Sequence, residues 1–177
     1  IGTFPGLGSL GASVTVAHTF PWMEVQHVIG LLVIADDLTG ALDSGVQLAR
    51  KGDRVAVSAD PTMDVALLGD YDVLVIDVET RHTSSDEAYR TVFELVSTAC
   101  AHGVTRIYKK VDSGLRGNVG AEIAAALAAS GRDHIDFVPA YPKMGRVTKG
   151  LVQYVDGRPL AQSFFATDPI DPVATSR

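Results

Sequence analysis

The stretch GLLVIADDLTG, residues 30–40, sets the fold that the sequence predicts. Its first part, Gly30 to Ala35, is apolar throughout, as expected of a strand that is covered on both faces of a parallel sheet. Two carboxylates follow, and the pattern predicts a helix from about Gly40 to Lys51 that is capped by Asp37 or Thr39. A buried strand, a polar turn and a helix form the opening of a βαβ unit.

The same alternation of short apolar runs and longer amphipathic runs continues along the chain. It predicts an α/β fold with a mostly parallel open sheet and helices on both faces. The further predicted strands span residues 54–59, 73–78, 106–110 and 135–138. A second helix begins at Ser84 and is ended by Gly103, and a third, rich in alanine, runs from Val119 to Ala129. Residues 151–160, with a turn at Asp156-Gly157, predict a C-terminal β-hairpin.

The composition of the chain excludes several classes of protein. Its 177 residues suffice for one well-buried domain, and 15 Lys and Arg against 21 Asp and Glu give a net charge of −6. An acidic chain is a poor general binder of nucleic acid, which requires a basic surface. A single cysteine, Cys100, excludes a disulfide framework and favours a reducing, cytoplasmic setting. No run of about 18 apolar residues lacks a charge or a turn former, so no membrane span is predicted.

Residues 1–28 form an irregular head that differs from the rest of the chain. Glu24 is the only charged residue there, and the apolar residues follow no period. A secretory signal is not expected, because no basic region precedes the apolar stretch. The sequence GLGSLG at residues 6–11 has the glycine spacing of a dinucleotide-binding loop, but only five residues precede it, which is too few for the strand that such a loop follows.

Polar and charged residues gather where the predicted strands end. They are Asp36 and Asp37 after the first strand, Glu79 to Arg81 after the third, Lys110 to Ser113 after the fourth, and Pro139 to Arg146 after the fifth. The carboxyl ends of parallel strands share one edge of the sheet, so we expect these residues to converge there. Seven of the 15 lysines and arginines lie near that edge: Arg81, Lys109, Lys110, Arg116, Lys143, Arg146 and Lys149. This concentration of positive charge predicts binding of a small anion; the alternative is that the charges only cap strands and solvate loops.

Two of these segments have more than one interpretation. Asp36 and Asp37 could hold a hydroxylated ligand, a metal or both, or one could cap the helix while the other is solvated. A phosphatase of the haloacid dehalogenase type would have a second Asp where this chain has Leu38. Residues 109–118 form a polar, glycine-containing loop that leads into a helix, and a helix start favours carboxylate or phosphate. The alternative is a loop that only caps the helix through Ser113 or Asn118.

Three stretches in this order resemble the four-carbon acid sugar kinases: IADDLTGA at 34–41, ETR at 79–81 and KVDSGLRGN at 110–118. The tail adds PAYP at 139–142, GR at 145–146, VDG at 155–157 and DP at 168–169. The resemblance covers residues 29–177 and implies the N-terminal, substrate-binding domain of that family. Such kinases phosphorylate the terminal hydroxyl of threonate, erythronate or 3-oxo-tetronate with ATP and Mg²⁺, which a separate C-terminal domain holds. On this resemblance we expect the chain to be truncated before that domain and inactive alone.

The resemblance also implies roles for individual residues. Asp37 would be the catalytic base or would orient the substrate hydroxyl, and Arg81 and Lys110 would clamp the carboxylate of the sugar acid. The implied substrate-binding residues are Asp36, Asp37, Arg81, Lys110, Val111, Asp112, Ser113 and Arg116, with Lys109, Asn118 and Arg146 in support. No metal ligand is expected in this chain.

Gly114 departs from the family pattern, which usually has Thr there, and this could loosen the loop. Two other functions stay open: a non-catalytic protein that binds a small anion on the same fold, and a Mg-dependent phosphatase that uses Asp36 or Asp37. The expected partner is a small anionic sugar acid, with neither nucleic acid nor membrane. The oligomeric state is open, with a homodimer as one possibility.

Overall fold

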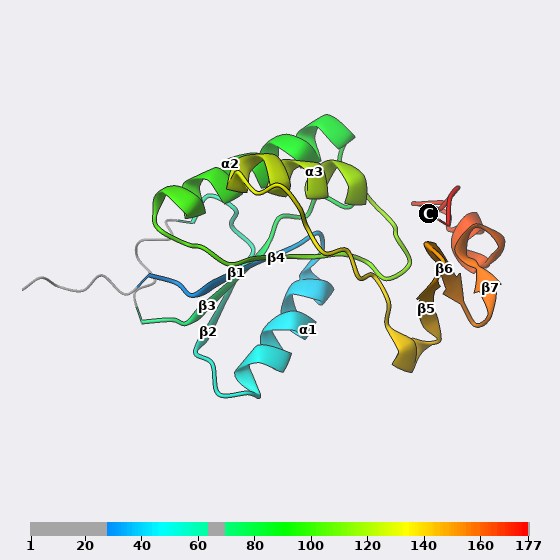
Figure 1. Ribbon diagram of the computed structural model, residues 1–177, viewed down its shortest axis with the longest axis horizontal. Coiled ribbons are helices and arrows are strands. Elements are labelled where there is room, and N and C mark those ends of the chain that lie inside the picture. The colour runs from blue at the N-terminus through cyan, green and yellow to red at the C-terminus, as the bar shows by residue number, and fades with distance from the viewer. Residues whose placement is uncertain (1–27, 64–69, 177) are drawn as a thin grey trace, which may run out of the picture.

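Four parallel strands form the central sheet of the computed structural model, which describes residues 28–63 and 70–176 (Figure 1). The strands are β1 (Leu31–Ala35), β2 (Val55–Ser58), β3 (Val73–Asp77) and β4 (Ile107–Lys110), and the helices are α1 (Leu38–Ala49), α2 (Ser85–Ala101) and α3 (Val119–Ser130). The order across the sheet is β2-β3-β1-β4. The predicted α/β fold with a parallel sheet is therefore confirmed.

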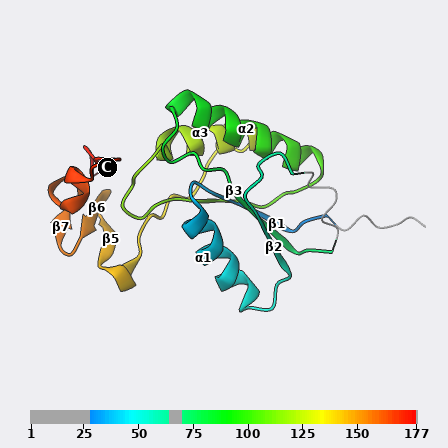
Figure 2. The same cartoon turned by 180° about the vertical axis from the view of Figure 1, so that it is seen from behind.

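Helices cover both faces of this sheet, which explains why β1 is apolar throughout and β3 is apolar up to Asp77. Helix α1 lies on one face, and α2 and α3 lie side by side on the other (Figures 1 and 2). Along β1, Leu32 and Ile34 belong to the core cluster beneath α2 and α3, whereas Val33 and Ala35 belong to the cluster beneath α1. Side chains that alternate between two buried faces are expected for a covered parallel strand.

The connections of β1 and of its two neighbours leave the sheet on opposite faces. β1 leads into α1, whereas β3 and β4 lead into α2 and α3. In the register of the sheet, Ala35 pairs with Asp77 on one side and with Lys110 on the other. The three strands therefore end level with one another, and the residues that follow them meet at a switch point, which is where open α/β sheets form their ligand crevice.

The prediction of a fifth strand at residues 135–138 is wrong. The segment follows α3 as an extended connection with no strand assigned. The apolar run is only four residues long and no layer of the protein covers it, so Ile135 and Phe137 are exposed and Val138 is 77% exposed. Without a buried face, the run lacks the packing that stabilises a strand at a sheet edge.

A small antiparallel sheet replaces that strand beyond the carboxyl ends of the main sheet (Figure 1). It consists of β5 (Arg146–Lys149), β6 (Val152–Val155) and β7 (Arg158–Pro159), followed by the short 3₁₀ helices η3 (Leu160–Gln162) and η4 (Phe164–Thr167); a further one, η2 (Pro142–Met144), precedes β5. The hairpin predicted around Asp156-Gly157 is confirmed, and both turn residues have positive φ, as its tight turn requires. Leu151, which we predicted within the strand, has a φ of 63° and lies in a second turn that joins β5 to β6.

Most of the predicted head, residues 1–27, lies outside the described residues. Among the helices of the described residues, none is both long and apolar enough to cross a membrane.

Candidate functional site

Arg81 joins the ends of β1 and β3 at the carboxyl edge of the sheet. Its Nε donates to Asp36 Oδ2 at 2.7 Å, and its Nη1 donates to Asp37 Oδ2 at 2.8 Å. The Arg81 backbone N–H also donates to the Asp36 carbonyl, at 3.3 Å. Asp37 is the N-cap of α1, because its Oδ1 accepts the Gly40 N–H at 3.0 Å. The two consecutive carboxylates therefore have different tasks, one buried against the arginine and one shared between the arginine and the helix start.

The charges around Arg81 keep it ionised. Burial alone would lower the pKa of Arg81, but its hydrogen bond to Asp36 and the charges of Asp36, Asp37 and Asp112 raise that pKa above its ordinary value. Asp36 is 2% exposed, so its carboxylate is removed from water and pairs with the Arg81 guanidinium instead. The Nη2 group of Arg81 bonds to no carboxylate of the described residues and can donate to a further group.

Lys110 brings an unpaired positive charge to the same edge. Its ammonium group forms no hydrogen bond or ion pair with any residue that the structure describes. It lies over the first turn of α1, where a Cβ built on Gly40 would come within 2.7 Å of both Lys110 Nζ and Asp37 Oδ1. An alanine at position 40 would therefore require the Lys110 ammonium group and the Asp37 carboxylate to shift from these positions.

The loop after β4 holds a second carboxylate between arginines. Arg116 Nε donates to Asp112 Oδ2 at 2.6 Å, and Arg116 Nη1 reaches Asp168 Oδ2 at 3.4 Å. Burial would raise the pKa of Asp112, but the hydrogen bond from Arg116 and the charges of Arg116 and Arg81 lower it below its ordinary value. The loop is therefore fixed by charge-assisted bonds that link it to the tail of the chain.

Phe165, from the C-terminal segment, supports the arginines on the outer side of this loop. The guanidinium groups of Arg116 and Arg146 lie 5.2 and 5.1 Å from the centre of its ring, within the range of cation–π contacts. Arg146 Nη1 also donates to Ser113 Oγ at 2.6 Å. The ring packs directly on Gly114, where a Cβ would come within 2.5 Å of a ring carbon. The aromatic ring therefore occupies the space that a side chain at position 114 would need.

These groups surround a groove of about 1,230 Å³ between α1, the carboxyl ends of β1 and β4, and the segment that leads into β5. Its charged lining residues are the cations Arg81, Lys110, Arg116, Lys143 and Arg146 and the carboxylates Asp37, Asp43 and Asp112. Val111, Ser113 and Tyr141 line it as well. Five positive charges against three negative ones give the groove an excess of positive charge in a protein whose net charge is −6. The groove thus has the electrostatic character that attracts a small anion.

The structure brings most of the predicted site residues into this groove but separates three of them. Asp36 lies buried behind Arg81 and does not line the groove. Lys109 points to the opposite face of the sheet, where its ammonium group lies 2.9 Å from the carboxylate of Glu122. Asn118 lines a neighbouring pocket. These three residues can influence a groove ligand only through the residues that they hold.

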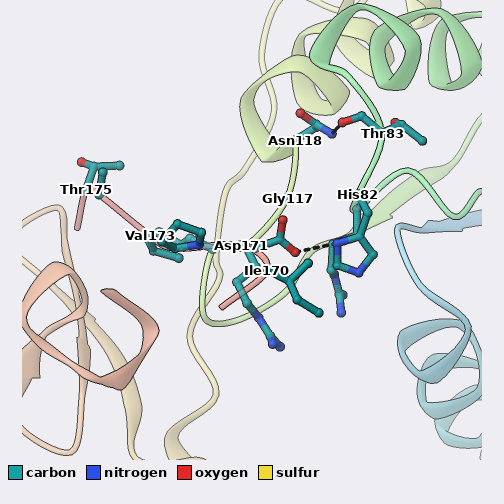
Figure 3. A pocket seen from close by; sticks show the side chains of 13 residues that line it. His82, Thr83, Gly117, Asn118, Ile170, Asp171, Val173 and Thr175 are labelled. Carbon is teal, nitrogen blue, oxygen red and sulfur yellow. Dashed lines mark hydrogen bonds and ion pairs between the residues drawn. The ribbon is translucent and has the colours of Figure 1, made fainter. Parts of the chain in front are cut away.

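The neighbouring pocket, of about 380 Å³, lies between the loop after β3, the start of α3 and residues 170–175 (Figure 3). Asn118 Nδ2 donates to the carbonyls of Thr80 and Thr83, both at 2.9 Å. His82 Nδ1 lies 2.8 Å from Asp171 Oδ2 and connects the tail of the chain to the loop after β3. Arg81 and Arg116 line both cavities, so this pocket adjoins the groove.

Sequence reasoning missed Glu122 and Phe165, and it placed Thr80 at the edge of the sheet without assigning it a role of its own. Glu122 Oε1 accepts the Thr80 hydroxyl, and its other oxygen pairs with Lys109. One signal was available for Glu122: consecutive residues of a strand point to opposite faces, so one of the two lysines that end β4 had to be buried and needed an acidic partner. No comparable signal identifies Phe165, because it reaches the loop after β4 from about 50 residues further along the chain.

The described residues offer no obvious metal centre. Across 28–63 and 70–176, no group of three or more His, Cys, Asp or Glu side chains could hold a metal ion. Asp36, Asp37 and Asp112 are engaged with arginines, and Asp37 also accepts a hydrogen bond at the start of α1.

Comparisons with known proteins give a consistent result. The family model described as "sugar-binding N-terminal domain" matches residues 31–177. A D-threonate kinase of Salmonella typhimurium is 41% identical over 148 residues, which cover 83% of this chain and 34% of that relative. A D-erythronate kinase of Heliobacterium modesticaldum is 40% identical over 145 residues, which cover 81% of this chain and 33% of the relative.

A solved structure matches over the same region. It is a domain of unknown function from Bordetella bronchiseptica, a domain-swapped dimer with bound citrate. It has a TM-score of 0.76 and 39% sequence identity, and the match covers 83% of this chain and 38% of that chain. The chain therefore spans about a third of the length of the curated relatives it matches.

Proposed function

The chain belongs to the sugar-binding N-terminal domain family, and from this membership we propose that its groove binds a four-carbon sugar acid as the substrate-binding part of an ATP-dependent kinase. Threonate, erythronate and 3-oxo-tetronate are the substrates in view. The relatives named as D-threonate and D-erythronate kinases support this substrate class. The citrate held by the Bordetella structure is also a small carboxylate anion that carries a hydroxyl group.

The observation that carries the proposal is the unpaired ammonium group of Lys110 in a groove with excess positive charge. A half-buried lysine whose ammonium group makes no internal bond is available to form a charge-assisted hydrogen bond with an anionic ligand. Lys110 and the free Nη2 of Arg81 are the donors that we assign to the substrate carboxylate. Asp37, which lines the same groove, accepts hydrogen bonds from the substrate hydroxyls and is the candidate base.

The remaining groove residues complete the assignment. Val111, Asp112, Ser113, Arg116 and Arg146 also line the groove, and we include them among the substrate-binding residues. Asp36 acts from behind, by holding Arg81. We take residues 29–177 as one domain for two reasons. Arg116 donates a hydrogen bond to Asp168 in the C-terminal tail, and the ring of Phe165 contacts the guanidinium groups of two groove arginines.

ATP and Mg²⁺ belong to the proposed reaction, but we assign neither of them to the described residues. The sequence lacks a GxxxxGK[ST] phosphate loop, and no group of acidic or histidine side chains in the described ranges could hold a metal. We therefore assign substrate binding to this chain and place ATP and Mg²⁺ outside its described residues. Because the Bordetella relative is a domain-swapped dimer, we include a homodimer in the proposal.

Titration of the 177-residue chain with D-threonate and D-erythronate, followed by calorimetry and by NMR chemical-shift changes, tests the proposal. We expect binding to the parent chain and a loss of about thirty-fold in affinity for Lys110→Met, since a charge-assisted hydrogen bond contributes about 2 kcal/mol. Lys51→Met is the matched control, because Lys51 is exposed just beyond the last turn of α1, at the end far from Asp37. Absence of binding by the parent chain, or equal affinities for the parent and Lys110→Met, would contradict the proposal.

A further inference from the structure

A buried ion pair lies on the face of the sheet opposite the groove. Lys109 and Lys110 are neighbours at the end of β4 and point to opposite faces. The Lys109 ammonium lies 2.9 Å from Glu122 Oε2 in α3, and both side chains are only 1% exposed. Lys109 Nζ also donates to the Lys110 carbonyl at 2.8 Å. The pair is therefore bonded to the backbone of the residue that carries the unpaired groove cation.

The same carboxylate reaches the backbone beside the second groove cation. Glu122 Oε1 accepts the hydroxyl of Thr80, which immediately precedes Arg81. The Thr80 carbonyl is in turn held by Asn118 Nδ2, from the residue before α3. One glutamate thus connects α3 with the ends of β3 and β4 at the points where Arg81 and Lys110 enter the groove.

Stability alone does not explain this arrangement. Removing two charges from water costs several kcal/mol per ion, and replacement of a buried ion pair by apolar residues of similar volume is often neutral or stabilising. The surroundings are already apolar, since Ala125 and Ala126 of α3 belong to the core cluster on this face. A Lys–Glu pair in this position differs from an apolar pair chiefly in its directional bonds to the ends of two strands.

We propose that Glu122 is a positioning residue of the sugar-acid site. Through Lys109 and Thr80 it fixes the backbone from which Lys110 and Arg81 extend, and so sets the spacing of the two cations that receive the carboxylate. This inference rests on the function proposed above, but its structural part concerns the chain without ligand. The expected signature is loss of ligand affinity without loss of stability.

The double variant Lys109→Met/Glu122→Leu tests the inference, because it removes both charges and leaves neither unpaired. We expect its free energy of unfolding to equal or exceed that of the parent chain, and its affinity for D-threonate to fall at least tenfold. A second readout needs no ligand: the Arg81 Nε–H, which donates to Asp36 at 2.7 Å, should exchange with solvent at least tenfold faster in the variant, as measured by ¹⁵N NMR. Lys51→Met again serves as the control for both readouts.

The outcomes separate this inference from the proposed function. A folded double variant with parental affinity and parental Arg81 Nε–H exchange overturns the positioning role. If the parent chain binds no sugar acid, the proposed function fails, and the Arg81 exchange rate alone decides the inference. Should the double variant not fold, Glu122→Gln is measured in its place, because an amide oxygen can still accept from Thr80 while the ionic bond to Lys109 is lost. Faster Arg81 exchange in Glu122→Gln supports the positioning role, and unchanged exchange overturns it.

Discussion

Two consecutive lysines at the carboxyl edge of the sheet lie in opposite environments on its two faces. On the side of α2 and α3, Lys109 is buried and neutralised by Glu122. On the side of α1, Lys110 lines an open groove and has no partner among the described residues. A strand that alternates its faces can thus place one lysine in the framework and leave the next one for a ligand. The number of charged residues near a strand end is therefore a poor guide to binding. A better guide is the identity of the charged residues that lack an internal partner.

Replacement of each lysine by methionine should give the largest difference in stability between the two sides of the sheet. Lys109→Met leaves Glu122 buried without a counter-ion, and we expect a loss of about 3–5 kcal/mol in the free energy of unfolding. Lys110→Met breaks no internal bond, so its unfolding free energy should stay within about 0.5 kcal/mol of the parent value. Denaturant unfolding of the two variants gives both numbers. Equal destabilisation would show that Lys110 also has a structural role.

The rim of the groove on the side of the small sheet allows a second test of intermediate size. Gly114→Thr would force a side chain against Phe165, and we expect a loss of about 1–3 kcal/mol in unfolding free energy from overpacking. The guanidinium groups of Arg116 and Arg146 lie against the Phe165 ring, so displacement of the ring should also lower the affinity for a sugar acid.

A matched double variant separates the steric effect from other causes. Phe165→Leu removes most of the ring that a threonine at 114 would meet, so Gly114→Thr should cost less stability in a Phe165→Leu background than in the parent chain. The same cost in both backgrounds would mean that the contact between position 114 and the ring is not responsible.

The sequence allowed the main sheet and the place of the site to be predicted, because the signals for both are local. The apolar run at 31–35, the cap residue Asp37 and the alternation of strands with helices each depend on near neighbours. Convergence at one edge follows from parallel topology alone. The strand predicted at 135–138 was wrong because the apolar composition of this segment does not reveal whether another layer of the protein covers it.

The details of the site depended on contacts that no local pattern contains. Gly114, where the resembling family usually has Thr, suggested a looser loop, whereas in the fold the ring of Phe165 fills the space beside Gly114. Likewise, the count of seven cations near the edge could not separate Lys109, paired with Glu122, from Lys110. Three-dimensional packing determines which residues of distant segments contact one another, and these contacts cannot be read from a single sequence.

The smallest expected effect concerns Asp77, the last residue of β3, which is buried and lies beside the groove carboxylates. Its Oδ1 accepts the Glu79 N–H at 3.0 Å, but its Oδ2 has no hydrogen-bond partner among the described residues. Burial, together with the charges of Glu79, Asp37 and Asp36, raises the pKa of Asp77 above its ordinary value of 3.8. We expect Asp77→Asn to gain about 1 kcal/mol in unfolding free energy at pH 7, since it removes an unpaired buried charge. Thermal and urea unfolding measure this gain.

The stability that Asp77→Asn gains should depend on pH. An acid whose pKa is higher in the folded chain binds its proton more tightly there, so its contribution to stability falls as the pH rises from 3.8 towards the folded pKa. The advantage of Asp77→Asn should therefore be absent at pH 3, where Asp77 is protonated in both states, and should grow as the pH rises above 3.8. Asp60 is the control of opposite sign: hydrogen bonds from the Thr62 hydroxyl and N–H lower its pKa, so it stabilises the fold above pH 3.8 and Asp60→Asn should lose stability at pH 7. If Asp77→Asn were equally stabilising at pH 3 and pH 7, the unpaired charge would not be its cause, and the contrast between a satisfied framework side and an unsatisfied groove side would not extend to β3.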